Sequence, residues 1–85
     1  MKKVKVAVYN DDVTPYNAVV QFFTQIFDMP EDDADAMTSL LDQQPKDVPL
    51  VLGEYIPEIA ESLVQECNNA NEMNDLTLRI EILKD

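Results

Sequence analysis

The sequence predicts an α+β fold in which helices pack on one face of a small, three-stranded, mostly antiparallel sheet. Two observations lead to this prediction: apolar residues alternate strictly near both ends of the chain, and they recur at helical spacing in three segments between. Prolines and polar clusters separate the segments in the order β-α-α-β-α-β. Eighty-five residues leave no room for a second core, so residues 1–85 are expected to form a single domain.

Three segments carry strand signals. Residues 3–9 place three valines on one face, and residues 76–82 alternate leucine and isoleucine with polar side chains. A shorter strand is expected at 48–52, and Pro49 within it favours a sheet edge because proline cannot donate to a neighbouring strand. Gly53, the single glycine of the chain, is interpreted as a sharp turn after this strand.

Proline marks the start of each expected helix. Thr14 suits the N-cap and Pro15 the first position of a helix whose apolar stripe includes three phenylalanines. A second helix should follow Pro30, where acidic residues in the first turn favour the helix dipole. The third is expected from Pro57 to about Ala70, and the polar stretch 68–75 is interpreted as a loop.

Composition limits the classes of function. The formal net charge of −11 disfavours nucleic acid and anionic lipid and favours cationic ligands or basic surfaces. Histidine is absent and Cys67 is the single cysteine, which excludes a typical zinc site and a Ser-His or Cys-His pair. Cys67 is expected to be a small buried hydrophobe. These residues alone predict an acidic α+β interaction domain with no residues that support an enzyme, in a protein without a signal peptide or membrane span.

The tripeptide Asn10-Asp11-Asp12 is the most unusual local feature. It lies where a strand leads into a helix, and its two carboxylates and amide oxygen are acceptors that suit an ammonium ligand. The same residue types are ordinary turn formers, which from the tripeptide alone is the simpler interpretation. A calcium loop is disfavoured, because the acidic stretch 28–35 lacks the required spacing and glycine.

Two segments resemble the ClpS family. Residues 6–15, VAVYNDDVTP, are similar to the family's strand ending in N-D-D-x-T-P. Residues 53–61, GEYIPEIAE, are similar to its G-x-[YF]-x-x-E-[IV]-A-E segment. Both occur in the expected order, and the resemblance covers the chain from Val4 to Leu83.

The resemblance implies an adaptor rather than an enzyme. Members of the family recognise N-degrons, which are protein N-termini that begin with a large hydrophobic residue. They dock on the N-domain of a ClpA or ClpC unfoldase and deliver the substrate for proteolysis without a cofactor. The N-terminal sequence does not have the pattern of a signal peptide, so the protein is expected in the cytoplasm, or in the plastid stroma if a transit segment was removed. It is expected to be a monomer.

The resemblance also implies the site residues. The amino-group receptors would be Asn10, Asp11, Asp12 and Asp42. The hydrophobic pocket would comprise Val8, Tyr16, Val19, Thr38, Leu41 and Leu78, and the unfoldase-docking residues would be Glu58, Glu61 and Leu63.

This chain departs from the family pattern at several of these positions. Asp42 stands where the family usually has histidine, Tyr16 and Thr38 stand where methionines are common, and Leu63 stands where lysine is frequent. We expect an altered degron preference rather than lost binding. The alternative is a ClpS-fold regulatory or interaction module of the Clp machinery that no longer binds degrons.

Overall fold

The computed structural model describes residues 2–84, which form a three-stranded antiparallel sheet with the order β2-β1-β3. The central strand β1 (Val4–Tyr9) pairs with β2 (Leu50–Tyr55) on one side and β3 (Arg79–Leu83) on the other. Their neighbours are α1 (Tyr16–Gln25), α2 (Glu31–Gln43) and α3 (Pro57–Asn74). The predicted α+β class and the β-α-α-β-α-β order are confirmed.

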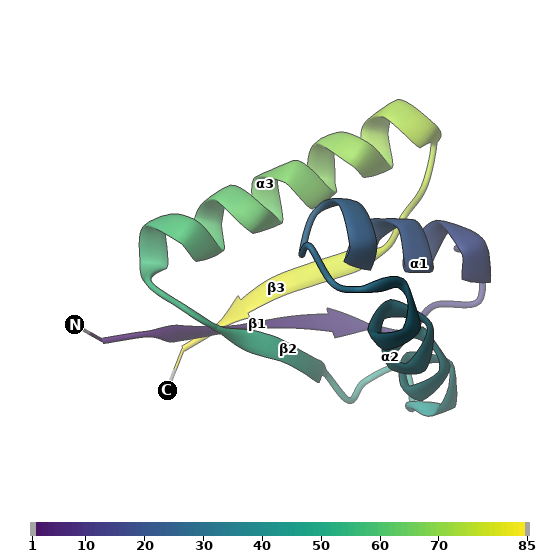
Figure 1. The fold of residues 1–85 in the computed structure, drawn as a ribbon, viewed down its shortest axis with the longest axis horizontal. Helices are drawn as coiled ribbons and strands as arrows, with labels where there is room; N and C mark the ends of the chain where they lie inside the picture. Colours follow the sequence, from purple (N-terminus) through teal and green to yellow (C-terminus); the bar gives the residue numbers. More distant parts are fainter. Residues whose placement is uncertain (1, 85) are drawn as a thin grey trace.

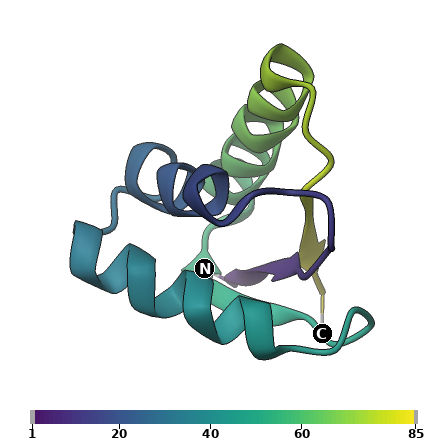
Figure 2. The same ribbon diagram turned by 90° about the vertical axis from the view of Figure 1, so that its right-hand side faces the viewer.

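The helices lie on one side of the sheet, as predicted. In Figure 1, α3 runs along the sheet above β1 and β3, and α1 and α2 lie towards the end where β1 finishes. Turned by 90°, the same side carries all three, and the opposite face of the sheet has no helix (Figure 2). This arrangement places the end of β1 beside both α1 and α2.

The core lies between the sheet and the helices. Its fully buried side chains include Val6 and Val8 of β1, Phe23 of α1 and Cys67 of α3. The edge of the Phe27 ring meets Phe23 at a centroid distance of 6.2 Å. Burying each large apolar side chain contributes about 1.5–3 kcal/mol. The valines at alternate positions of β1 therefore hold the central strand in place.

A β-bulge in β2 sets which of its side chains enter the core. Val6 pairs with Gly53 but the next residue, Ala7, pairs with Val51, so one extra residue, Leu52, interrupts the register. Without it, strict alternation from Leu52 would put Glu54 on the core face. The bulge instead turns Tyr55 towards the core, where it packs.

Gly53 is a strand residue, so its interpretation as a sharp turn is wrong. The Tyr55 ring covers it: a Cβ at Gly53 would lie 3.0 Å from the Tyr55 hydroxyl and 3.2 Å from two ring carbons. The glycine is needed for this close approach. The strand predicted at 48–52 accordingly begins later and continues through Gly53 to Tyr55.

The third helix is longer than predicted, and the expected loop at 68–75 is wrong. The helix continues to Asn74 and ends at Asp75, whose φ of 55° is left-handed. Asn71 accounts for part of the difference, because its side chain both accepts from the Leu78 backbone N–H and donates to the Leu78 carbonyl. These bonds tie the end of α3 to the approach of β3, which begins at Arg79 rather than Leu76.

The start of α1 also differs from the prediction. Pro15 is the cap and its carbonyl accepts from the backbone N–H groups of Ala18 and Val19, while Thr14 makes no capping bond. The Thr14 hydroxyl donates instead to the Asp11 carboxylate. The loop before α1 is therefore organised by Asp11.

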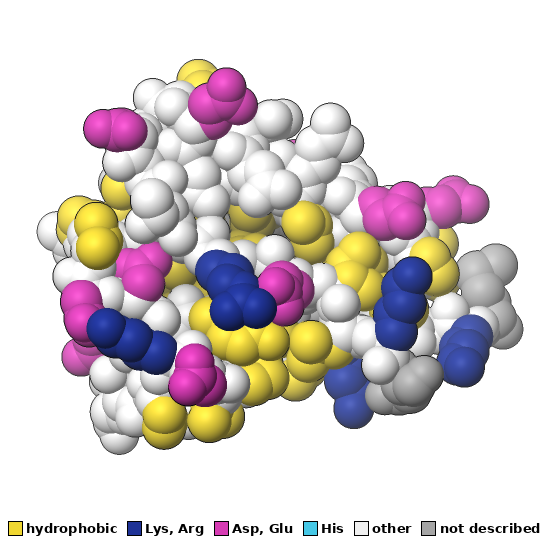
Figure 3. Space-filling model, turned by 180° about the vertical axis from the view of Figure 1, so that it is seen from behind, with side chains coloured by type: hydrophobic (Ala, Val, Ile, Leu, Met, Phe, Trp, Pro, Cys, Tyr) yellow, Lys and Arg dark blue, Asp and Glu magenta, His cyan; other side chains and the backbone are white. Residues whose placement is uncertain are grey.

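The uncovered face of the sheet is mixed in character. By alternation it carries Lys5, Ala7 and Tyr9 of β1, and the Arg79 guanidinium lies 4.1 Å from the centroid of the Tyr9 ring. Figure 3 shows hydrophobic side chains at its centre with Lys and Arg side chains around them.

Candidate functional site: an apolar pocket with a rim of hydrogen-bond acceptors

A small pocket opens at the end of β1, between α1 and α2. Its volume is about 40 Å³. It is lined by Asn10, Asp11, Thr14, Tyr16, Val19, Thr38, Leu41, Asp42 and Leu78. The polar groups come from the segment after β1 and from the end of α2, and the apolar ones come from the helices and from Leu78.

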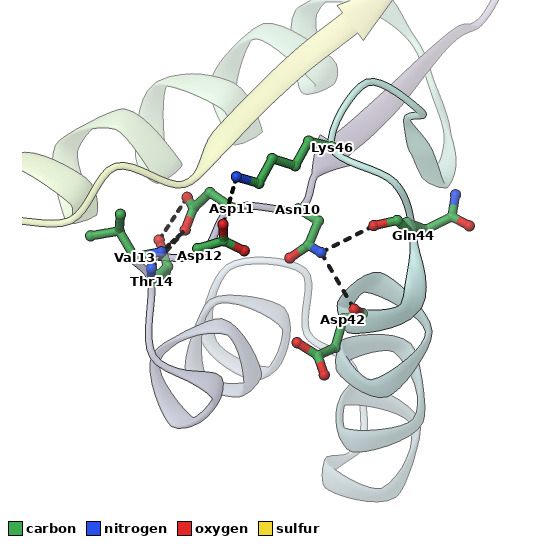
Figure 4. Close-up of polar contacts among 8 residues, drawn as sticks. All are labelled: Asn10, Asp11, Asp12, Val13, Thr14, Asp42, Gln44 and Lys46. Atoms are coloured by element: carbon green, nitrogen blue, oxygen red, sulfur yellow. Dashed lines mark hydrogen bonds and ion pairs between the residues drawn. The ribbon is translucent and has the colours of Figure 1, made fainter.

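Asn10 is held with its amide oxygen available. Its Nδ2 donates to the backbone carbonyls of Gln44 and Asp42, at 3.1 and 3.4 Å (Figure 4). A carbonyl oxygen can only accept, so these partners require the nitrogen and fix the orientation of the amide. The Oδ1 atom is then left as an acceptor beside the pocket.

The Asp42 carboxylate lies on the same side of α2 as the Asn10 oxygen. Figure 4 shows the two groups pointing into the same space, between the end of β1 and the end of α2. Asp42 is exposed and lines the pocket. The pair offers one neutral and one charged acceptor and no competing donor towards the pocket.

The structure gives Asp11 a mainly structural role. One carboxylate oxygen accepts from the backbone N–H groups of Val13 and Thr14, at 2.9 and 2.6 Å, and the other accepts from the Thr14 hydroxyl. A carboxylate has about four acceptor positions, and three are taken here. Asp11 lines the pocket and adds negative charge there, but its bonds shape the turn that leads into α1.

Asp12 does not reach the pocket. Its carboxylate pairs with the Lys46 ammonium at 2.5 Å, on the loop between α2 and β2, and both side chains are mostly exposed. Figure 4 shows the Lys46 side chain reaching the Asp12 carboxylate, apart from the Asp42 carboxylate. Consecutive residues of a tight turn diverge in direction, so the expectation that Asp11 and Asp12 act together is not met by this geometry.

Five of the six predicted hydrophobic residues line the pocket. Val19, Leu41, Thr38 and Leu78 are buried, and Tyr16 is 42% exposed. Val8 is the exception: it is fully buried in the core beneath the pocket and does not line it. Its role is to support the wall rather than to form it.

Thr38 is less polar towards the pocket than its residue type suggests. Its hydroxyl donates to the Ala34 carbonyl one turn earlier in α2, at 2.7 Å. With the hydroxyl occupied, the methyl group is what remains for the wall. The buried part of the lining is therefore mostly apolar, and the other polar lining residues are more exposed.

Two residues at the site were missed from the sequence. Thr14 lines the pocket instead of capping the helix. Asp35 accepts a hydrogen bond of 2.7 Å from the Tyr16 hydroxyl, which raises the pKa of Tyr16 above its ordinary value of 10.0. Asp35 lies three residues before Thr38, so helical spacing from a predicted wall residue could have indicated it.

The predicted docking residues lie at the other end of the molecule. Glu58 and Glu61 are exposed on the first turns of α3, and Leu63 is partly buried. Glu58 also borders a surface hollow together with Lys2, Ile56 and Pro57. Figure 1 shows the start of α3 beside the N-terminal end of β1, whereas the pocket lies at the opposite end of that strand.

Cys67 and the many acidic residues are the other features of the sequence that could carry chemistry. Burial raises the pKa of the Cys67 thiol to about 12, so the thiol stays neutral, as expected of a buried hydrophobe. Within residues 2–84, no three acidic, cysteine or histidine side chains converge as a metal site would require. None of the helices formed by these residues is long and apolar enough to span a bilayer.

Comparison with known proteins identifies the class as a protease adaptor. The family model described as ATP-dependent Clp protease adaptor protein ClpS matches residues 1–81, so the chain belongs to the ClpS family. A similar solved structure is that of Agrobacterium tumefaciens ClpS2 bound to L-phenylalaninamide, with a TM-score of 0.87 and 23% sequence identity. That match covers 99% of this chain and 98% of the other, and it confirms the fold. No curated protein matches the sequence.

Proposed function

We propose that this protein is an N-degron adaptor that binds the first residue of a substrate in the pocket and delivers the substrate to a Clp unfoldase. One observation carries the proposal: the acceptors Asn10 Oδ1 and Asp42 lie on the more exposed part of a pocket whose buried lining is mostly apolar. A protein N-terminus that begins with a hydrophobic residue has the complementary arrangement, an ammonium next to an apolar side chain. Membership in an adaptor family supports binding rather than catalysis.

The rim suits a free α-amino group. An ammonium has three donors and no acceptor, and the rim presents acceptors without a facing donor. Asn10 is already oriented by Gln44 and Asp42, so little conformational entropy is lost on binding. The net charge of −11 further favours a cationic ligand.

The interior suits the first side chain of the ligand. Val19, Leu41 and Leu78 form apolar walls, and the Thr38 methyl completes them. Burying one large hydrophobic side chain contributes roughly 2–3 kcal/mol. Charged hydrogen bonds to the ammonium add about 1.5–3 kcal/mol each. Together these correspond to an affinity on the order of micromolar.

Delivery would use the start of α3. Glu58 and Glu61 match the family's docking segment and are exposed, and their position at the far end of β1 leaves the pocket open when a partner is docked. Leu63 adds a partly buried apolar group beside them. We propose this surface as the contact with the N-domain of a ClpA or ClpC unfoldase.

Peptide binding tests the recognition step. Fluorescence anisotropy would be measured with peptides that differ only in the first residue (Leu, Phe, Tyr, Trp, Ile, Met or Ala), each with a free and an acetylated N-terminus. Binding of hydrophobic first residues that acetylation abolishes, and that alanine does not match, is the expected result. If no free peptide binds, the adaptor proposal fails and a regulatory module that does not bind degrons becomes the better interpretation.

Reconstituted degradation tests the delivery step. A substrate with a hydrophobic N-terminal residue would be incubated with ClpP and ClpA or ClpC, with and without this protein. The double variant Glu58→Lys and Glu61→Lys should bind peptide normally but lose stimulation of degradation. Glu66→Lys and Glu72→Lys, on the later turns of the same helix, form the matched control. Equal loss in both double variants would argue against docking at the start of α3.

A further inference from the structure

We propose that the hydrogen bond between Tyr16 and Asp35 is a latch that limits the size of the side chain the pocket admits. The inference rests on the proposed function and adds the specificity of the same site. The bond joins the first residue of α1 to the first half of α2, on either side of the pocket.

The Tyr16 hydroxyl has its acceptors on a single residue. It donates to the Asp35 carboxylate at 2.7 Å and also lies 3.0 Å from the Asp35 backbone carbonyl oxygen. A carboxylate acceptor makes a stronger hydrogen bond than a neutral one. These contacts hold the Tyr16 ring in place as one wall of the pocket.

With the latch closed, the pocket is small. Its volume is about 40 Å³, whereas an apolar cavity that holds a benzene ring measures about 150 Å³. An aromatic first residue therefore needs a wall to move. A branched aliphatic side chain has fewer heavy atoms than a phenylalanine or tryptophan side chain and needs less widening.

Tyr16 is the wall that can move. The other apolar walls are at most 5% exposed and are packed into the core, so displacing them would break close packing. Tyr16 is 42% exposed and is not part of the core, so its ring can swing outward with little loss of core contact. Opening then costs mainly the hydrogen bond to Asp35.

Selectivity follows from this cost. A ligand that binds only the open form has an apparent affinity reduced by the fraction of protein that is open. The apparent affinity is reduced for peptides that begin with an aromatic residue, and it is reduced less for peptides that begin with leucine. The latch therefore shifts the preference of the pocket towards aliphatic first residues.

Peptides that begin with Leu, Phe and Trp test the latch on the wild type and on Tyr16→Phe, which keeps the ring and removes the donor. The ratio of aromatic to leucine affinity should rise on the order of fivefold in Tyr16→Phe. Asp35→Ala should raise the ratio less, because the backbone oxygen still accepts, and Asp35→Asn should keep most of the discrimination. Asp33→Ala, which removes an exposed charge from the same helix, should leave the ratio as in the wild type.

The outcomes separate the two proposals. Leucine peptides that bind every variant with an unchanged aromatic-to-leucine ratio would show that Tyr16 is a fixed wall, and would overturn the latch alone. A wild type that binds no free peptide would overturn the adaptor function and the latch with it. A raised ratio in Asp33→Ala equal to that in Asp35→Ala would assign the effect to charge and overturn the latch.

Discussion

The side-chain amide of Asn10 donates to the backbone carbonyl of Gln44, at 3.1 Å and 34 positions along the chain. This bond connects the end of the central strand to the residue that follows α2. It does so with the nitrogen, and it thereby leaves the amide oxygen at the pocket. A single side chain thus both closes the fold at this corner and presents an acceptor to the ligand.

Replacing Asn10 by aspartate should weaken the stability of the fold. Aspartate has the same shape but would turn a carboxylate oxygen towards the carbonyls of Asp42 and Gln44, where two acceptors already lie. The free energy of unfolding should fall by about 1–3 kcal/mol at neutral pH in urea titrations. Unchanged stability would mean that these bonds do not hold the corner together.

Asp42→Ala and Asp12→Ala each remove one negative charge, but they should have very different effects on peptide affinity. Asp42 lines the pocket, so Asp42→Ala should lower the affinity for a free-amine peptide about tenfold. Asp12 pairs with Lys46 at an exposed position, and Asp12→Ala should change the affinity less than about twofold. Anisotropy at two salt concentrations measures both. An equal loss of affinity in both variants would indicate that Asp12 also binds the amino group.

Gly53→Ala should destabilise the fold through Tyr55. The new Cβ would lie 3.0 Å from the Tyr55 hydroxyl and 3.2 Å from its ring, which forces the ring away from Gly53. The expected cost is about 1–3 kcal/mol, as for other overpacked sites, measured by urea unfolding. In a Tyr55→Leu background the same substitution should cost much less. An equal cost in both backgrounds would point to the backbone of the bulge instead.

Cys67 makes stability fall at alkaline pH. Its pKa is raised from an ordinary 9.0 to about 12 in the folded protein, so above pH 9 the unfolded chain releases a proton that the folded chain keeps. Fewer protons on the unfolded state means that stability decreases as pH rises from 9 to 12, by up to about 1.4 kcal/mol per pH unit. Cys67→Ala, compared by urea unfolding at pH 7 and 10, should lose this dependence. An identical pH dependence in both proteins would contradict it.

Local patterns were sufficient to predict the order of the elements. Alternating valines in β1 and the proline before each helix are short-range signals, and they give the order of the strands and helices correctly but not all of their bounds. Asn71 and Gly53 show where such signals end. Asn71 extends a helix by bonding to Leu78, and Gly53 is required by the ring of Tyr55. Both partners are near in the sequence, but neither contact follows from the spacing of apolar residues or from the prolines.

The candidate site could be predicted only in part, because some of its contacts depend on the fold and not on local sequence. Most of the wall residues followed from the family resemblance, because they sit at fixed positions on α1 and α2. The resemblance did not predict the direction in which each carboxylate points. Asp11 faces its own turn, Asp12 faces Lys46, and Tyr16 reaches Asp35, and each of these depends on how the loops and helices meet.

The central strand also acts as a spacer. It has six residues and so spans about 20 Å, with the start of α3 near one end and Asn10 at the other. Because its core-facing valines are close-packed, the strand holds its two ends at a fixed separation. If both proposed contacts form, a peptide at Asn10 and an unfoldase domain at the start of α3 would occupy separate surfaces, so neither should exclude the other.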